Sequence, residues 1–321
     1  MRTIRSWAGP ALAAATLAIV VWRLGTGPFL AGLKAVDVRA VLAAAGVVLV
    51  ATLCSAWRWR IVADGLGVRL SLRAAFFGYY RAMFLNLMVP GGVAGDVHRG
   101  VSHGREVRDV GRALRAVVWE RTAGQVVQVV LTIAVLLVLP SPVRPVMPFV
   151  AVAAVGIVVG LVLVSRMQLG TAGSRWKRAR IAVASDIRNG VLRRSALPAV
   201  VLTSIVVALA HAATFLIAAR TVGVTAPISR LLPLALLAVL ATALPNVGGW
   251  GPREGVTAWL FSAAGLGAGQ GAATAVTFGI LVLAATLPGA LVLVAERIPR
   301  RRMSRPREHR SIFRPEGAAD A

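Results

Sequence analysis

The sequence predicts an all-α polytopic membrane protein with about six full transmembrane helices and two re-entrant broken-helix hairpins, about eight membrane segments in all. Apolar residues make up 57% of the 321 positions, and the mean hydropathy is +0.76, both outside the range of soluble domains. Several apolar stretches have the length of a membrane span. Two other segments, near 86–99 and 244–255, are broken by glycine and proline and carry charge within apolar sequence.

Apolar stretches long enough to cross a bilayer recur along the chain. A full span needs roughly 17–25 apolar residues. Such stretches lie near 7–24, 39–57, 117–139, 146–165, 197–219 and 271–295. The stretches 74–92 and 230–266 are also apolar, but they are interrupted. Irregular backbone at membrane depth survives only where protein or a watery cavity satisfies its polar groups, so these two segments are expected to line a site.

Basic residues set the expected orientation. The formal net charge is +24, and the arginines gather in 2–5, 58–73, 99–115, 166–194 and 297–314. These groups share the cytoplasmic side only if the first broken segment re-enters from that side and the second re-enters from the outside. We therefore expect a protein of the cytoplasmic (inner) cell membrane with both termini cytoplasmic, its charge facing lipid headgroups and not nucleic acid. Residues 1–296 would form the membrane domain and 297–321 a basic, disordered tail.

The first broken segment runs from Asn86 to Arg99. Its expected backbone break consists of Pro90, Gly91, Gly92 and Gly95, since proline stops a helix and glycine adopts dihedrals closed to other residues. Asp96 suits the N-cap of the next helix, which would make the segment a capped hairpin. Alternatively, exposed amides together with Arg81 and Arg99 form an anion site for a phosphate headgroup.

The second broken segment has the same character. Its expected hairpin backbone consists of Pro245, Gly248, Gly249 and Gly251. Pro252 and Glu254 suit the first turn of a helix, where the helix dipole favours an acid. Arg253 either extends to the outer membrane interface or makes a second phosphate contact on the outer half of a path.

Glu120 and Arg121 stand side by side at the start of the span 117–139. Neighbouring residues do not face each other on a helix, so each is expected to pair elsewhere. Glu120 would pair with Arg81 or Arg99, and Asp96 with Arg121, either as a functional set or as structural ion pairs. His211 lies in the middle of a span, where it is either a satisfied core histidine or a proton relay.

No metal or cofactor is expected. Cys54 is the single cysteine, and the histidines are scattered without ligand spacing. No nucleotide-binding motif is present, so any transport would be passive or coupled to ions, with Asp96, Glu120 and Glu254 as candidate coupling acids. A nucleophile motif is also lacking, and we expect a role other than that of an enzyme.

Three motifs in order resemble the lysylphosphatidylglycerol synthase transmembrane region, a family also described as flippase-like. They are Asn86-x3-Pro90-Gly91-Gly92-x2-Gly95-Asp96-x2-Arg99, then Glu120-Arg121, then Leu244-Pro245-x2-Gly248-Gly249-x-Gly251-x-Arg253-Glu254. Val97-His98 departs from the apolar pair expected before Arg99. The resemblance spans about residues 10–295 and implies a domain that moves modified phospholipids between leaflets. The sequence is expected to lack the soluble aminoacyl-transferring domain of the bifunctional synthase.

These features predict a translocator of phospholipids or lipid-linked intermediates. Its partners would be anionic or polyprenyl-phosphate lipids and, as some relatives suggest, a separate synthase or glycosyltransferase. Two alternatives remain: a non-catalytic membrane partner of such an enzyme, or a membrane-embedded headgroup-transfer enzyme. The expected substrate-binding residues are Arg81, Asn86, Asp96, Arg99, Glu120, Arg121, Arg253 and Glu254.

Overall fold

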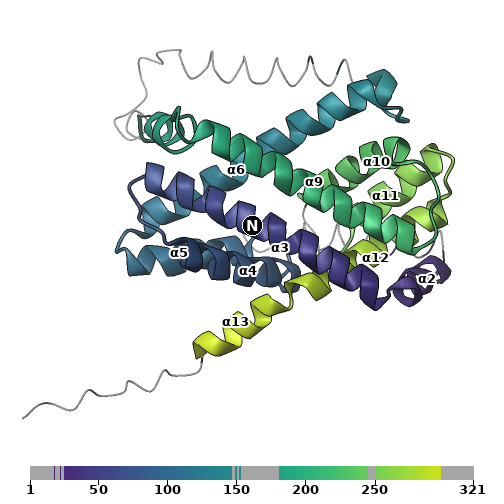
Figure 1. The fold of residues 1–321 in the computed structure, drawn as a ribbon, viewed down its shortest axis with the longest axis horizontal. Helices are drawn as coiled ribbons and strands as arrows, with labels where there is room; N and C mark the ends of the chain where they lie inside the picture. Colours follow the sequence, from purple (N-terminus) through teal and green to yellow (C-terminus); the bar gives the residue numbers. More distant parts are fainter. Residues whose placement is uncertain are drawn as a thin grey trace, which may run out of the picture.

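The computed structural model describes residues 25–146, 181–244 and 250–297, together with the isolated positions 18, 22, 149 and 152. The main elements in these ranges are helices, which confirms the all-helical prediction (Figure 1). They are α2 (Gly27–Ala35), α3 (Val38–Gly65), α4 (Leu72–Met88), α5 (Ala94–Glu106), α6 (Val110–Val138), α9 (Leu197–Thr221), α10 (Ile228–Ala241), α11 (Pro252–Ala263), α12 (Ala268–Thr286) and α13 (Pro288–Arg297).

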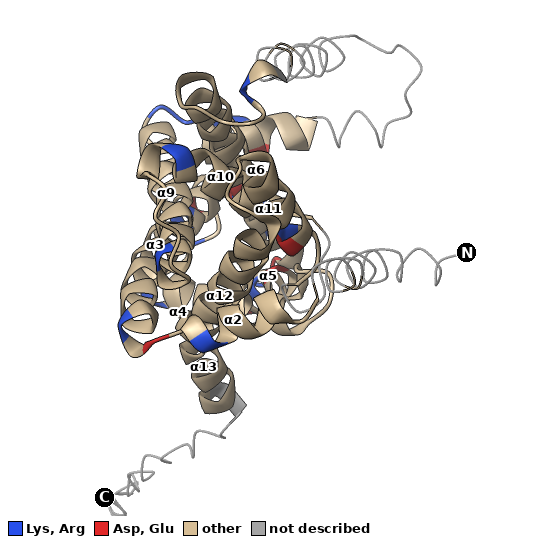
Figure 2. Ribbon diagram, turned by 90° about the vertical axis from the view of Figure 1, so that its right-hand side faces the viewer, with Lys and Arg blue, Asp and Glu red and all other residues tan. Residues whose placement is uncertain are grey.

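Four apolar helical stretches in the described ranges are long enough to cross a membrane. Three are α3, α6 and α9, which confirm the predicted spans 39–57, 117–139 and 197–219. The fourth, Ala268–Ala295, matches the span 271–295, but it is divided at Leu287 because Pro288 follows. Figure 2 shows long uncharged stretches on α9 and α12. The predicted spans 7–24 and 146–165, and the tail 298–321, lie outside the described ranges.

The first broken segment forms a hairpin of α4 and α5. Helix α4 ends at Met88 and α5 begins at Ala94, with Gly91 and Gly92 at φ angles of 98° and 68° between them. Helix α5 returns along α4, as Figure 1 shows. Gly95 permits the close approach, since a Cβ there would lie 2.0 Å from the Ala82 carbonyl oxygen. The helix break was therefore predicted at the right place.

The second broken segment lies between α10 and α11. Pro245, Gly248 and Gly249 are outside the described ranges. Helix α11 begins after Gly251, whose φ of 126° is open to glycine but strained for other residues. Helices α10 and α11 pack on each other, and the rings of Phe215, Phe261 and Phe278 meet in the apolar core beside them.

Candidate functional site

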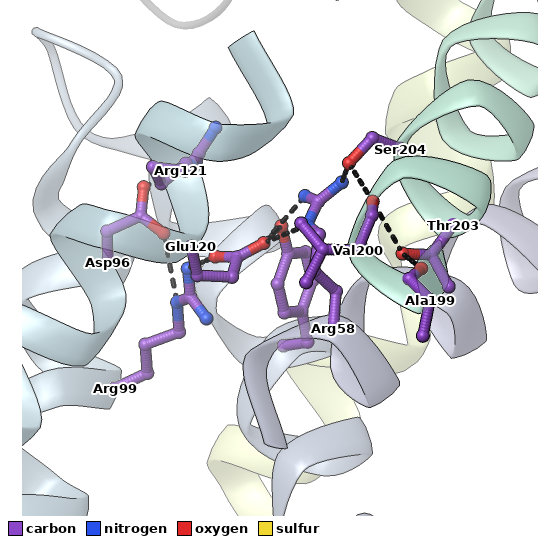
Figure 3. A network of polar contacts seen from close by, with 10 residues as sticks. Arg58, Asp96, Arg99, Glu120, Arg121, Ala199, Val200, Thr203 and Ser204 are labelled. Atoms are coloured by element: carbon purple, nitrogen blue, oxygen red, sulfur yellow. Dashed lines mark hydrogen bonds and ion pairs between the residues drawn. The ribbon is translucent and has the colours of Figure 1, made fainter. Parts of the chain in front are cut away.

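A buried polar network around Glu120 joins five helices, α3, α4, α5, α6 and α9 (Figure 3). Glu120 on α6 is fully buried. Its Oε1 accepts hydrogen bonds from Nε and Nη2 of Arg58 on α3, at 2.9 and 2.6 Å. Its Oε2 accepts from Nη2 of Arg99 on α5 at 2.6 Å. Arg58 also donates from Nη1 to the hydroxyl of Ser204 on α9, at 3.0 Å, so one carboxylate connects helices distant in sequence.

Asp96 is the second acid of the network. Its Oδ1 accepts from Arg99 Nε at 3.0 Å, and its Oδ2 accepts from Asn86 Nδ2 at 3.0 Å and from Arg121 Nη2. The predicted pairs of Glu120 with Arg99 and of Asp96 with Arg121 are therefore confirmed. Glu120 and its neighbour Arg121 do not pair with each other in these contacts, as predicted from their positions on the helix.

The predicted N-cap role of Asp96 is wrong. The N-cap of α5 is Val93, and Asp96 is the third residue of the helix, where its carboxylate serves the arginines. Asn86 from the end of α4 takes the capping function, since its Oδ1 accepts from the Gly95 backbone N–H at 2.7 Å. An amide side chain can accept from the backbone and donate to Asp96 at once, which an acid cannot.

Arg99 is held between two aromatic rings. Its guanidinium carbon lies 4.5 Å from the ring centroids of Trp59 and Tyr79, and the residue is only 1% exposed. Such cation–π contacts strengthen when the cation is desolvated. Arg99 is thus clamped, with its Nε and Nη2 donating to the two acids.

Arg58, Trp59, Tyr79 and Ser204 were missed by sequence reasoning. Arg58 was assigned to a basic loop because the predicted span ended at residue 57, whereas α3 continues to Gly65. Gly124 on α6 makes room for the Arg58 guanidinium, since a Cβ there would lie 2.9 Å from Nη2. Arg60, two residues later, is largely exposed. Only the packing of α3 against α6 and α9 distinguishes these two arginines.

The network carries one more positive than negative charge. Three guanidiniums, of Arg58, Arg99 and Arg121, meet two carboxylates, of Asp96 and Glu120. The side chains of Arg58 and Arg99 are 5% and 0% exposed. The Arg121 side chain retains 46% of its accessible surface, so Arg121 is the most exposed cation of a network with one surplus positive charge.

Three cavities meet at Arg121, which together with Thr242 lines all of them. The first, of about 150 Å³, is the polar cavity between α3, α6 and α9. The second, of about 360 Å³, is a mainly apolar groove between α5 and α6 that includes Gly91, Gly92 and Asp96. The third, of about 180 Å³, extends from Asn86 and Arg121 to Arg253.

Arg253 and Glu254 form a separate, local pair. Glu254 Oε1 accepts from Nε of Arg253 at 3.0 Å and from its Nη2, and Glu254 Oε2 accepts from the Gly251 backbone N–H at 2.7 Å. Pro252 and Glu254 lie in the first turn of α11, as predicted. The interpretation of Arg253 as an interfacial arginine is wrong, because it is 5% exposed and its guanidinium lies 5.1 Å from the Phe278 ring.

The expected site residues thus fall into a network, a pair and one separate position. The network holds Asn86, Asp96, Arg99, Glu120 and Arg121, and the pair holds Arg253 and Glu254. Arg81 is buried on α4 and lines none of the three cavities that meet at Arg121.

Comparison with known proteins supports the resemblance carried by these motifs. A family model described as the lysylphosphatidylglycerol synthase TM region matches residues 6–289, which is most of the chain. No curated protein and no solved structure matches it. The match and the long apolar helices establish a multi-pass membrane protein with a function related to membrane lipids. The chain belongs to the lysylphosphatidylglycerol synthase TM region family.

Proposed function

We propose that this protein moves phospholipids or lipid-linked intermediates across the cytoplasmic membrane, and that Arg121 binds the lipid phosphate. The observation that carries the proposal is the position of Arg121, whose half-exposed side chain lines three cavities and belongs to a network with one surplus positive charge. A guanidinium in such surroundings suits a phosphate, because its fork of N–H donors matches the phosphate oxygens.

The remaining network residues would position Arg121. Asp96 fixes its guanidinium, and Arg99 and Glu120 hold Asp96 in turn through their own contacts. A headgroup crossing hydrocarbon pays a large desolvation penalty, which a fixed, partly hydrated cation would lower. The cavity between Arg121 and Arg253 supports a path toward the second broken segment.

The apolar groove supports a lipid as the ligand. Val93 and Val97 of α5 and Val118 of α6 line it, and each is more than half exposed. Its lining also includes the charged side chains of Asp96 and Arg121. An acyl or polyprenyl chain could lie along these valines while its phosphate reaches Arg121, so the groove matches the amphipathic shape of a lipid.

The test is lipid scrambling by purified protein in liposomes. Phosphatidylglycerol with a fluorescent acyl chain would be followed by quenching of the label in the outer leaflet. Arg121→Gln should slow transport by about tenfold or more, since it removes the charge that offsets the penalty. The matched control is Arg112→Gln on the same helix, which removes an exposed arginine paired only with Asp109 in the contacts seen here.

Equal transport by wild type and Arg121→Gln would contradict the phosphate site. If wild-type protein moved no lipid of any class, the translocator proposal would be wrong, and a role beside a separate lipid-modifying enzyme would become the better account. Chemical change of the lipid headgroup during the assay would instead indicate a membrane-embedded enzyme.

A further inference from the structure

The polar cavity next to Arg121 has an unusual lining for the interior of a membrane protein. Hydroxyl and amide side chains face it, together with one imidazole; they are Thr52, Ser55, Tyr79, Gln125, Gln128, Ser204, Thr242 and His211. The Nε2 of Gln128 is buried without a hydrogen-bond partner. A buried amide donor without a partner is costly, so Gln128 would be stabilised by a ligand that brought an acceptor beside it.

His211 contributes an acceptor to the same space. Its Nδ1 lies 2.8 Å from the Val207 carbonyl oxygen, and since a carbonyl only accepts, Nδ1 carries the hydrogen. In the neutral ring, Nε2 is then an acceptor. His211 lines both the polar cavity and the cavity that leads to Arg253, so its free acceptor lies on the proposed path.

The charged groups that line the polar cavity are cations. Arg58 and Arg121 line it, and no carboxylate does so among the residues that the structure describes. The two acids of the network, Asp96 and Glu120, are already engaged by guanidiniums. A further cation brought into this cavity would be repelled, because like charges at short range in a low-dielectric site disfavour each other strongly.

We propose that the polar cavity receives the group attached to the lipid phosphate, and that this group is an uncharged polyol. This inference rests on the proposed translocation of a lipid whose phosphate binds Arg121. Hydroxyl groups can donate to His211 Nε2 and accept from Gln128 Nε2 without adding charge, whereas a cationic aminoacyl group would place a further positive charge beside Arg58 and Arg121. A volume of about 150 Å³ equals that of roughly five water molecules at about 30 Å³ each. This suits a glycerol or a single sugar.

Four lipids with labelled chains test the inference in liposomes. They are phosphatidylglycerol, a polyprenyl-phosphate hexose, phosphatidic acid, which lacks the polyol, and lysylphosphatidylglycerol, which adds a cation. At least one of the two polyol lipids should move about tenfold or more faster than the lysyl lipid and faster than phosphatidic acid. The faster of the two identifies the source of the polyol.

Movement of the lysyl lipid or of phosphatidic acid at the rate of the faster polyol lipid would overturn the inference and leave the translocator proposal intact. Movement of no lipid would overturn both. A charge substitution adds an independent test. Gln128→Glu places a carboxylate of the same shape in the cavity and should raise transport of the lysyl lipid about tenfold relative to wild type. Gln128→Leu, which removes the amide without adding charge, should give no such gain. Failure of Gln128→Glu to raise lysyl-lipid transport would count against the inference.

Discussion

The charged side chains of the two broken segments find their ion-pair partners in different ways. At the α4–α5 hairpin, Asp96 and Arg99 connect through Glu120 to Arg58, so compensation spans helices far apart in sequence. At the start of α11, Arg253 pairs with its neighbour Glu254, and the same carboxylate accepts from the Gly251 backbone. The first arrangement depends on the assembled bundle, whereas the second is complete within one helical turn.

This difference makes the two arginines unequally accessible to a ligand: Arg121 is half-exposed, whereas Arg253 is buried. The network has one surplus positive charge, and its most exposed cation, Arg121, lines three cavities. The α11 pair is formally neutral and nearly closed, with Arg253 5% exposed. Two segments that look alike in sequence therefore differ in structure, and the proposed function places primary anion binding at the first.

Neutralising the buried acids Glu120 and Glu254, one at a time, should give the largest difference in stability between the two segments. Glu120→Gln leaves both Arg58 and Arg99 without their carboxylate, so the free energy of unfolding in detergent should fall by about 3–5 kcal/mol. Glu254→Gln affects one guanidinium and one backbone N–H and should lower the unfolding free energy by about 1–3 kcal/mol. Denaturant titration of both purified variants measures the difference. Equal losses would show that the network is no more cooperative than the local pair.

The close contact within the first hairpin gives the next largest effect. Gly95→Ala places a Cβ 2.0 Å from the Ala82 carbonyl oxygen, so α5 must move away from α4 and carry Asp96 with it. The free energy of unfolding should fall by about 1–3 kcal/mol, and lipid transport should be lost. Gly269→Ala is the matched control, because its Cβ would meet only Pro28 Cγ at 3.7 Å. Unchanged transport in Gly95→Ala would contradict the positioning role of the hairpin.

The smallest effect is expected from alanine substitutions at the two glycines that leave room for buried arginines. A Cβ at Gly124 would lie 2.9 Å from Arg58 Nη2, and one at Gly279 would lie 2.7 Å from Arg253 Nη2. Each alanine variant should lower the unfolding free energy by about 1 kcal/mol. Gly124→Ala should reduce transport more than Gly279→Ala, because displacement of Arg58 reaches Arg99 through Glu120. Scrambling assays on both variants test this, and equal transport would argue against coupling through the network.

The sequence predicted the helix break of the first hairpin and the helix start of the second. Pro90, Gly91 and Gly92 interrupt apolar sequence in a way that local backbone chemistry explains. The pairs of Glu120 with Arg99 and of Asp96 with Arg121 were also within reach, since buried charges need partners. The capping role of Asn86 was not, because it depends on where α4 ends relative to Gly95.

The composition of the sequence and the positions of its prolines and glycines were enough to predict an all-helical membrane protein. They also predicted its long apolar helices and the two places where charged residues interrupt apolar sequence. These properties follow from the length and hydropathy of local segments, because a bilayer accepts an apolar segment only if it is long enough to span and satisfies its own backbone hydrogen bonds. The tertiary structure decided that Arg58 joins the network, that Arg99 lies between Trp59 and Tyr79, and that Arg121 faces the cavities. Which face of a helix a charge occupies has meaning only once its neighbours are packed against it, and α3, α5, α6 and α9 supply those neighbours from distant parts of the chain.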